Sequence, residues 1–154
     1  MAPTPPDAPQ PQGCRLSIRP DPGEIRRSSG WLTSSCLDRG VPREQIGRLE
    51  LCLNEVLANL IDHGRVERLA APVDLALNVN KIDGKGTATL TILDTCLPFD
   101  PLLHQIGATP RSLREAEPGG LGLLLLKSFS DELSYRRLDD RNELKMSVYW
   151  PVRV

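Results

Sequence analysis

The chain has 154 residues, with 19 basic and 20 acidic side chains and a formal net charge of −1. That length corresponds to one domain, and the balanced charge argues against a broad basic surface for nucleic acid or for a membrane. Apolar residues make up 40% of the chain and aromatic residues only 4%, so we expect an aliphatic core. No apolar run approaches the ~20 residues of a membrane helix, and no stretch near the start resembles a signal peptide. We therefore expect a cytoplasmic protein.

Prolines are concentrated at the beginning of the chain, where half of the 14 fall within residues 1–22. This segment also lacks a periodic apolar pattern until about residue 14. We predict a disordered proline-rich tail over residues 1–13 and a single domain over residues 14–154. The four cysteines are widely spaced and fit neither a zinc site nor a disulfide framework, so we expect small buried or incidental thiols.

The first half of the domain predicts one strand followed by two helices. Residues 15–19 alternate between polar and apolar side chains, as in a short strand. Asp21 is a predicted N-cap, Pro22 is the first residue of the helix that follows, and Gly40 marks its end. A second helix is predicted over residues 42–63, where apolar residues recur at steps of three and four. These residues are Ile46, Leu49, Leu53, Val56, Leu57 and Leu60.

The second half predicts four strands and one helix. The strands are predicted over residues 73–79, 87–93, 131–138 and 143–152. The first two form a hairpin through a turn at residues 83–86, and a helix is predicted over residues 121–129. The long stretch 94–120 has little periodicity and is expected to be a functional or mobile loop. The order indicates an α+β, two-layer sandwich in which helices cover one face of a mostly antiparallel mixed sheet.

Glu55 and Asn59 form the first candidate for chemistry. They lie four residues apart, hence on one face of the second helix, at the border of its apolar stripe. A carboxamide such as Asn59 offers a neutral oxygen to Mg²⁺, and a carboxylate such as Glu55 can accept a proton from an attacking hydroxyl. The alternative is that both are ordinary polar residues on an exposed face.

Asp94 is the second candidate, because it directly follows a predicted strand. A carboxylate in that position can accept a hydrogen bond from an exocyclic amine such as that of adenine. The alternative is a turn-forming Asp ahead of Pro98.

The third candidate is a run of glycines that leads into an apolar helix. Gly119, Gly120 and Gly122 leave backbone N–H groups open to phosphate oxygens, and the start of the helix adds favourable polarity. The pattern is neither a Walker loop nor G-x-G-x-x-G. The alternative is a flexible hinge before a core helix.

Taken in this order, the three segments resemble the GHKL (Bergerat-fold) ATPase superfamily, and more narrowly the anti-sigma-factor serine/threonine kinases of bacterial partner switching. Glu55 to Asn59 resembles the N box of that family, the segment 94–101 its first glycine box, and 119–123 its second. Cys96 stands where the family has a glycine. The resemblance extends over residues 14–152 and implies the histidine-kinase-like ATPase fold.

The resemblance also implies roles for individual residues. Glu55 would be the catalytic base and Asn59 the ligand of Mg²⁺. The nucleotide, ATP, would be contacted by Asn59, His63, Asp94, Cys96, Phe99, Gly119, Gly120, Leu121, Gly122 and Leu123.

As the resemblance implies, the chain would be an anti-sigma factor and an ATP-dependent protein kinase. It would hold a sigma factor inactive and phosphorylate a serine or threonine of a STAS-domain antagonist, and relatives suggest a homodimer. Neither nucleic acid nor a membrane is expected as a partner. The alternative is a regulatory module that binds nucleotide, or none, and sequesters a partner without phosphotransfer. Cys96 favours that alternative, whereas the Glu55/Asn59 pair favours the kinase.

Overall fold

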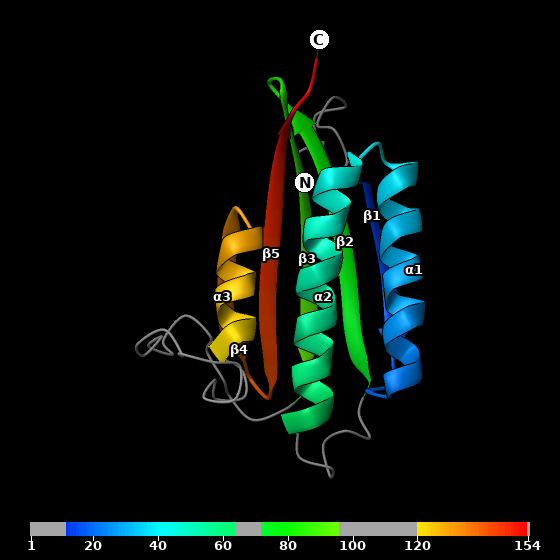
Figure 1. Ribbon diagram of the computed structural model, residues 1–154, viewed down its shortest axis with the longest axis vertical. Helices are drawn as coiled ribbons and strands as arrows, with labels where there is room; N and C mark the ends of the chain where they lie inside the picture. Colours follow the sequence, from blue (N-terminus) through cyan, green and yellow to red (C-terminus); the bar gives the residue numbers. More distant parts are fainter. Residues whose placement is uncertain (1–11, 64–71, 96–119, 154) are drawn as a thin grey trace, which may run out of the picture.

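The computed structural model describes residues 12–63, 72–95 and 120–153. Its framework is a five-stranded sheet in the order β1-β2-β3-β5-β4 (Figure 1). The strands are β1 (Gln12–Ile18), β2 (Val73–Ile82), β3 (Lys85–Asp94), β4 (Glu132–Leu138) and β5 (Arg141–Pro151). All four pairings between these strands are antiparallel. The predicted antiparallel character is therefore confirmed, but the described strands contain no parallel pair that would make the sheet mixed.

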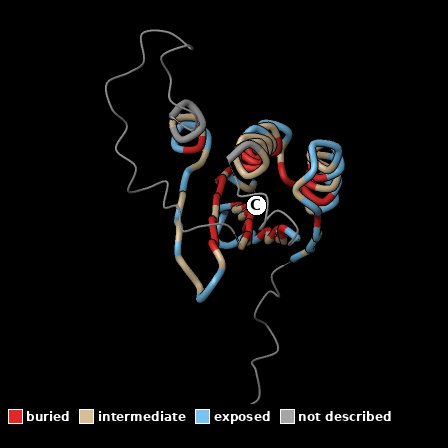
Figure 2. The backbone as a smooth tube through the Cα atoms, turned by 90° about the horizontal axis from the view of Figure 1, so that it is seen from below, coloured by how far each residue is buried: buried red, intermediate tan, exposed pale blue. Residues whose placement is uncertain are grey.

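The three helices of the described part lie on one face of this sheet, which Figure 2 shows from the end of the molecule. They are α1 (Pro22–Asp38), α2 (Arg43–His63) and α3 (Gly120–Phe129). The element order β-α-α-β-β-α-β-β agrees with the prediction, as does the two-layer α+β architecture. Neither α1, α2 nor α3 is both long enough and apolar enough to span a membrane.

The start of α1 follows the sequence prediction closely. The side chain of Asp21 accepts a hydrogen bond from the backbone N–H of Gly23 at 2.8 Å, and Pro22 is the first helical residue. This cap satisfies a backbone donor that has no partner within the helix. At the other end the helix stops at Asp38, and Gly40 takes a φ of +74°, which glycine adopts readily.

The core lies between the helices and the sheet. The predicted apolar residues of α2 are buried except Leu60, which is partly buried, and Leu49 and Leu53 have no exposed surface. They meet alternate residues of the central strands, because successive side chains of a strand point to opposite faces. The buried strand residues on this face include Leu75, Leu77, Leu90, Ile92, Met146 and Val148. The even-numbered residues of β3 and β5 therefore face the helices.

The opposite face of the sheet, which we call the open face, is polar and is covered by none of the described helices. Its residues include Thr89, Arg136, Glu143, Ser147 and Tyr149. The hydroxyls of Thr89 and Ser147 lie 2.8 Å apart, and Arg136 Nε donates to Glu143 Oε1 at 2.6 Å. These cross-strand pairs tie β3, β5 and β4 together away from the apolar core.

Both hairpins are tighter than predicted. Asp83 and Gly84 have positive φ angles of 51° and 75°, which makes a two-residue turn, so Ile82 pairs directly with Lys85. Residues 85 and 86, predicted as turn, consequently belong to β3. In the last hairpin Leu138 pairs with Arg141, so β5 begins two residues before its predicted start at residue 143.

Strand β1 also begins earlier than its predicted start at residue 15. Gln12 pairs with Val79 and Gly13 with Asn78, so residues 12 and 13 join the sheet. The prediction had assigned them to the tail because periodicity is weak over so few residues. Residues 1–11 lie outside the described part of the chain.

Candidate functional site

The three candidate segments come from distant parts of the sequence, but the elements that carry them end at the same end of the sandwich. In Figure 1 the C-terminal ends of α2 and β3 and the N-terminal end of α3 all lie at the lower end of the molecule. Glu55 and Asn59 belong to the last turns of α2, Asp94 is the last residue of β3, and Gly120 is the first residue of α3. The fold thus gathers the elements bearing the predicted site residues.

Glu55 and Asn59 are half-buried, and Val56 and Leu57 next to Glu55 are buried in the core. Both polar residues therefore lie at the border of the apolar stripe, as the sequence predicted. One turn of helix separates them, so their side chains project from the same face of α2. His63, the last residue of α2, belongs to the described backbone, but its side chain lies outside the described part.

Asp94 is buried, with 7% of its surface exposed, and it lies on the face of the sheet that the helices cover. A buried carboxylate is costly unless hydrogen-bond donors surround it. One such donor is the amide of Asn142, whose Nδ2 lies 2.9 Å from Asp94 Oδ1. The two residues are cross-strand partners at the ends of β3 and β5. The sequence predicted Asp94 but not this partner.

Asn142 is itself held from strand β4. Its Oδ1 accepts hydrogen bonds from the hydroxyl of Tyr135 at 2.5 Å and from Arg137 Nη1 at 3.1 Å. Asn142 is 5% exposed, so the whole amide is withdrawn from solvent. The alternation of the closing hairpin could have located it, because a two-residue turn makes Arg137 the cross-strand partner of Asn142.

Helix α3 begins at Gly120, one residue before its predicted start. Its N-terminal end lies at the same end of the molecule as the end of β3, so the backbone N–H groups that have no partner within the helix and the positive end of its dipole lie there too. That arrangement suits an anion such as a phosphate. Leu126, near the middle of the helix, is buried in the core.

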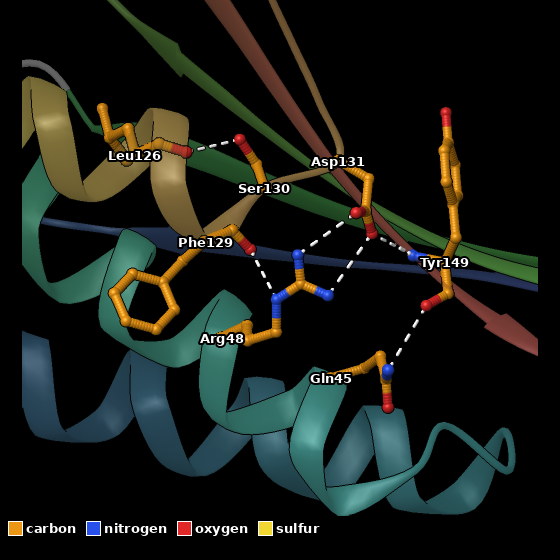
Figure 3. A network of polar contacts seen from close by, with 7 residues as sticks. All are labelled: Gln45, Arg48, Leu126, Phe129, Ser130, Asp131 and Tyr149. Atoms are coloured by element: carbon orange, nitrogen blue, oxygen red, sulfur yellow. Dashed lines mark hydrogen bonds and ion pairs between the residues drawn. The ribbon is translucent and has the colours of Figure 1, made fainter.

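The opposite end of α3 is fixed by a polar network centred on Arg48 of α2 (Figure 3). Arg48 Nε donates to the carbonyl oxygen of Phe129 at 2.9 Å, and its two Nη atoms reach the carboxylate of Asp131 at 3.4 and 3.3 Å. Asp131 also accepts from the backbone N–H of Tyr149 at 2.7 Å, and Gln45 Nε2 donates to the carbonyl of Tyr149 at 3.3 Å. The network sets the position of α3 against the helix that carries Glu55 and Asn59.

Other predicted site residues lie outside the described part of the chain: Cys96, Phe99 and Gly119. The side chains of Leu121 and Leu123 and the surroundings of Gly122 also lie outside it, although α3 includes these three residues. Two of the other thiols, those of Cys36 and Cys52, are buried, as expected, and Cys14 is half-buried. Burial raises the pKa of Cys36 to about 12 and that of Cys52 to about 11.

A family comparison decides the relationship. Residues 18–148 match the family described as the histidine kinase-like ATPase domain. The chain belongs to this family. The matched span contains every candidate site residue, and it confirms the resemblance to GHKL ATPases and the histidine-kinase-like ATPase fold that this resemblance implied.

Comparisons with individual proteins agree with this family assignment. The chain is 33% identical over 101 residues to the serine/threonine-protein kinase BtrW of Bordetella bronchiseptica, covering 66% of this chain and 68% of BtrW. A solved structure of the RsbU and RsbW domains of Rv1364c from Mycobacterium tuberculosis matches 95% of this chain with a TM-score of 0.59 and 14% identity. This chain spans 35% of that longer one. The SiaB–SiaC complex from Pseudomonas aeruginosa gives a TM-score of 0.53 at 14% identity, over 89% of both chains.

Proposed function

We propose that this protein is an ATP-dependent serine/threonine kinase and anti-sigma factor that phosphorylates a STAS-domain antagonist. The observation that carries the proposal is the Glu55/Asn59 pair, half-buried in the last turns of α2. It belongs to a chain that is 33% identical to the serine/threonine-protein kinase BtrW. A protein that only sequestered a partner would not need a proton acceptor beside a magnesium ligand.

Three features of the described residues support a nucleotide site. The buried carboxylate of Asp94 suits the exocyclic amine of a base, and the start of α3 suits the phosphates. Asn59 offers the neutral oxygen that Mg²⁺ accepts alongside phosphate oxygens. When bound, the ion would neutralise charge on the phosphates; Asn59 is the residue that would hold it.

The reaction would be in-line transfer of the γ-phosphoryl group to a hydroxyl of the antagonist. The hydroxyl oxygen forms a bond to the γ-phosphorus, the bond from that phosphorus to the oxygen of ADP breaks, and Glu55 accepts the proton. Such transfer depends mainly on positioning and charge neutralisation, with a carboxylate receiving the hydroxyl proton.

The partners follow from the same proposal. SiaB was solved in a complex with SiaC, and RsbW domains occur beside an RsbU domain in Rv1364c. By analogy, this chain would bind a protein antagonist, hold a sigma factor when the antagonist is phosphorylated, and act as a homodimer. These activities would take place in the cytoplasm.

The proposal is tested by incubating the purified chain with γ-labelled ATP, Mg²⁺ and STAS-domain proteins from the same genome. We expect label on a serine or threonine of one of them, and none when Mg²⁺ is chelated. Tight binding of the antagonist with no transfer under any of these conditions would contradict the kinase and favour sequestration without phosphotransfer.

A further inference from the structure

The hydrogen bonds around Asp94 form a directed chain that begins on strand β4. Tyr135 and Arg137 donate to Asn142, and Asn142 donates to Asp94. Asp94, Asn142 and Arg137 are cross-strand partners in one row across β3, β5 and β4. Both Asn142 and Asp94 are more than nine-tenths buried. Asn142 and Asp94 are therefore held in place, because neither can turn without breaking their buried hydrogen bond.

The direction of these hydrogen bonds sets the orientation of the Asn142 amide. A carboxamide has an oxygen that only accepts and a nitrogen that only donates. Because the hydroxyl of Tyr135 and the guanidinium of Arg137 both approach with hydrogens, they select Oδ1 as their partner. Nδ2 is then the atom that faces the Asp94 carboxylate. A flipped amide would put two oxygens against each other.

We propose that Asn142, oriented by Tyr135 and Arg137, is a positioning residue that presents Asp94 to a base with a single amine donor and so selects ATP over GTP. The inference rests on the proposed function, since it assumes that Asp94 contacts the base.

The selectivity follows from the donor pattern of the two bases. Adenine presents one exocyclic amine, whereas guanine presents a ring N–H and an amine side by side and an oxygen where adenine has its amine. A carboxylate recognises guanine best when both oxygens accept in parallel. Asn142 already donates to Oδ1 at 2.9 Å, so a second donor to that oxygen would have to share it with the amide, which favours recognition through one donor.

The neighbouring pair Arg136 and Glu143 provides a matched control. It joins the same two strands one residue further along, also through an arginine, but on the open face of the sheet. Tyr149 is a second control, because it is a tyrosine of β5 that also lies on the open face. A hydrogen bond with Glu132 raises the pKa of Tyr149 to about 12.

The experiment measures the affinities for ATP and GTP by calorimetry, with Mg²⁺ present. For Asn142→Ala we expect ATP affinity to fall about 10- to 100-fold and GTP affinity to fall much less, since a hydrogen bond to a charged group is lost. Tyr135→Phe keeps the ring and removes one neutral donor, so a fall of about 3- to 10-fold for ATP is expected. Glu143→Gln and Tyr149→Phe should leave the ratio of the two affinities unchanged.

Tyr135→Phe keeps the test decisive if Asn142→Ala does not fold. An unchanged ratio in Tyr135→Phe, or an equal change in Tyr149→Phe, would overturn the inference. The proposed function is judged separately by phosphotransfer in the wild type. Transfer with unaltered selectivity in the variants would reject the inference alone. Altered selectivity in the variants, together with a wild type that never transfers phosphate, would support the inference and reject the kinase. A wild type that binds neither nucleotide would reject both.

Discussion

Arg48 on α2 and Phe129 at the end of α3 are joined by a hydrogen bond of 2.9 Å from the guanidinium to the backbone carbonyl. The last carbonyls of a helix have no partner within the helix, and a cation there also opposes the negative end of the helix dipole. Because the same guanidinium reaches Asp131, it holds both sides of the junction between α3 and β4 (Figure 3). Arg48 therefore adds a polar tie between α2 and the end of α3 to the apolar packing that includes Leu126.

Arg48→Ala should lower the free energy of unfolding by about 1–3 kcal/mol, since it leaves the carbonyl of Phe129 without this donor and removes the ion pair with Asp131, which keeps the backbone N–H of Tyr149. Chemical denaturation measures that loss. Hydrogen exchange should also accelerate in α3 more than in α1. Arg27→Ala is the control, because its ion pair with Glu24 is exposed and should contribute less than about 1 kcal/mol. Equal losses in the two variants would contradict the role given to Arg48.

Gly86 offers a second prediction, because it is the cross-strand partner of Trp150. A Cβ atom at this position would collide with the indole of Trp150. Gly86→Ala should therefore destabilise the fold by about 1–3 kcal/mol, as the ring or the strand must move to make room. The midpoint of urea denaturation, followed by circular dichroism, reports the change.

Gly30 is the matched control for that substitution. It lies inside α1, and a Cβ atom there would meet nothing within 4 Å. Gly30→Ala should stabilise the protein by about 0.5–1 kcal/mol, because alanine loses less backbone entropy in a helix. If both alanines destabilise the chain, the argument from the space around Gly86 is wrong.

Sequence periodicity predicted the elements of this fold well because the apolar face is unambiguous. Asp21 and Pro22 marked the start of α1, and the predicted apolar residues of α2 are buried except Leu60, which is partly buried. Strand ends were predicted less well. Residues 12 and 13 belong to β1 only because β2 is long enough to pair with them, and a sequence pattern over so few residues does not report on a partner strand.

The candidate site was predictable only in part, for a related reason. Glu55, Asn59 and Asp94 stand in motifs whose order along the chain can be recognised. Asn142 has no such motif, since its contact with Asp94 depends on the register between β3 and β5. Arg48 could not be predicted from the sequence for a similar reason, because it contacts Phe129, which is far away along the chain and is brought close only by the tertiary fold.

Glu143 should give the stability of the protein a measurable dependence on acid pH. The hydrogen bond from Arg136 holds the pKa of Glu143 below its ordinary value of 4.5. A carboxyl with a lowered pKa in the folded state contributes stability above its unfolded pKa, and this contribution disappears as the pH falls through the folded value. The difference in unfolding free energy between the wild type and Glu143→Gln should thus be constant near neutral pH and shrink below about pH 4.5.

Arg136→Met provides the test of cause for this dependence. In that background Glu143 has lost its main donor and keeps only the ammonium of Lys145, 3.9 Å away, among the ion pairs of the described residues, so the acid-dependent part of the Glu143→Gln difference should be much smaller. Denaturation curves of the four proteins across the acid range form the complete cycle. If the difference between the proteins with and without Glu143 depends on pH just as strongly after Arg136 is replaced, Arg136 is not the cause of the dependence.

Replacing Glu55 and replacing Asn59 should have different effects, because Glu55 is the proposed proton acceptor and Asn59 the proposed ligand of Mg²⁺. Glu55→Gln keeps the shape of the side chain and removes the proton acceptor, so single-turnover transfer to the antagonist should fall by about 10²–10⁴-fold. Binding of nucleotide and antagonist should persist, because neither uses the base. Asn59→Ala should weaken Mg²⁺-dependent nucleotide affinity as well as the rate, since the proposed ligand of the ion is lost.

Glu50→Gln is the control for this last prediction, because Glu50 is also a half-buried glutamate of α2 but lies on a different face from Glu55. Five residues of helix turn its side chain by about 140° away from that of Glu55. Its removal changes the charge of α2 equally and should leave the rate of transfer unaltered. If Glu55→Gln transfers phosphate at the wild-type rate, Glu55 is not the base. If Glu50→Gln slows transfer as strongly, the effect comes from the overall charge of the helix and not from proton acceptance at Glu55.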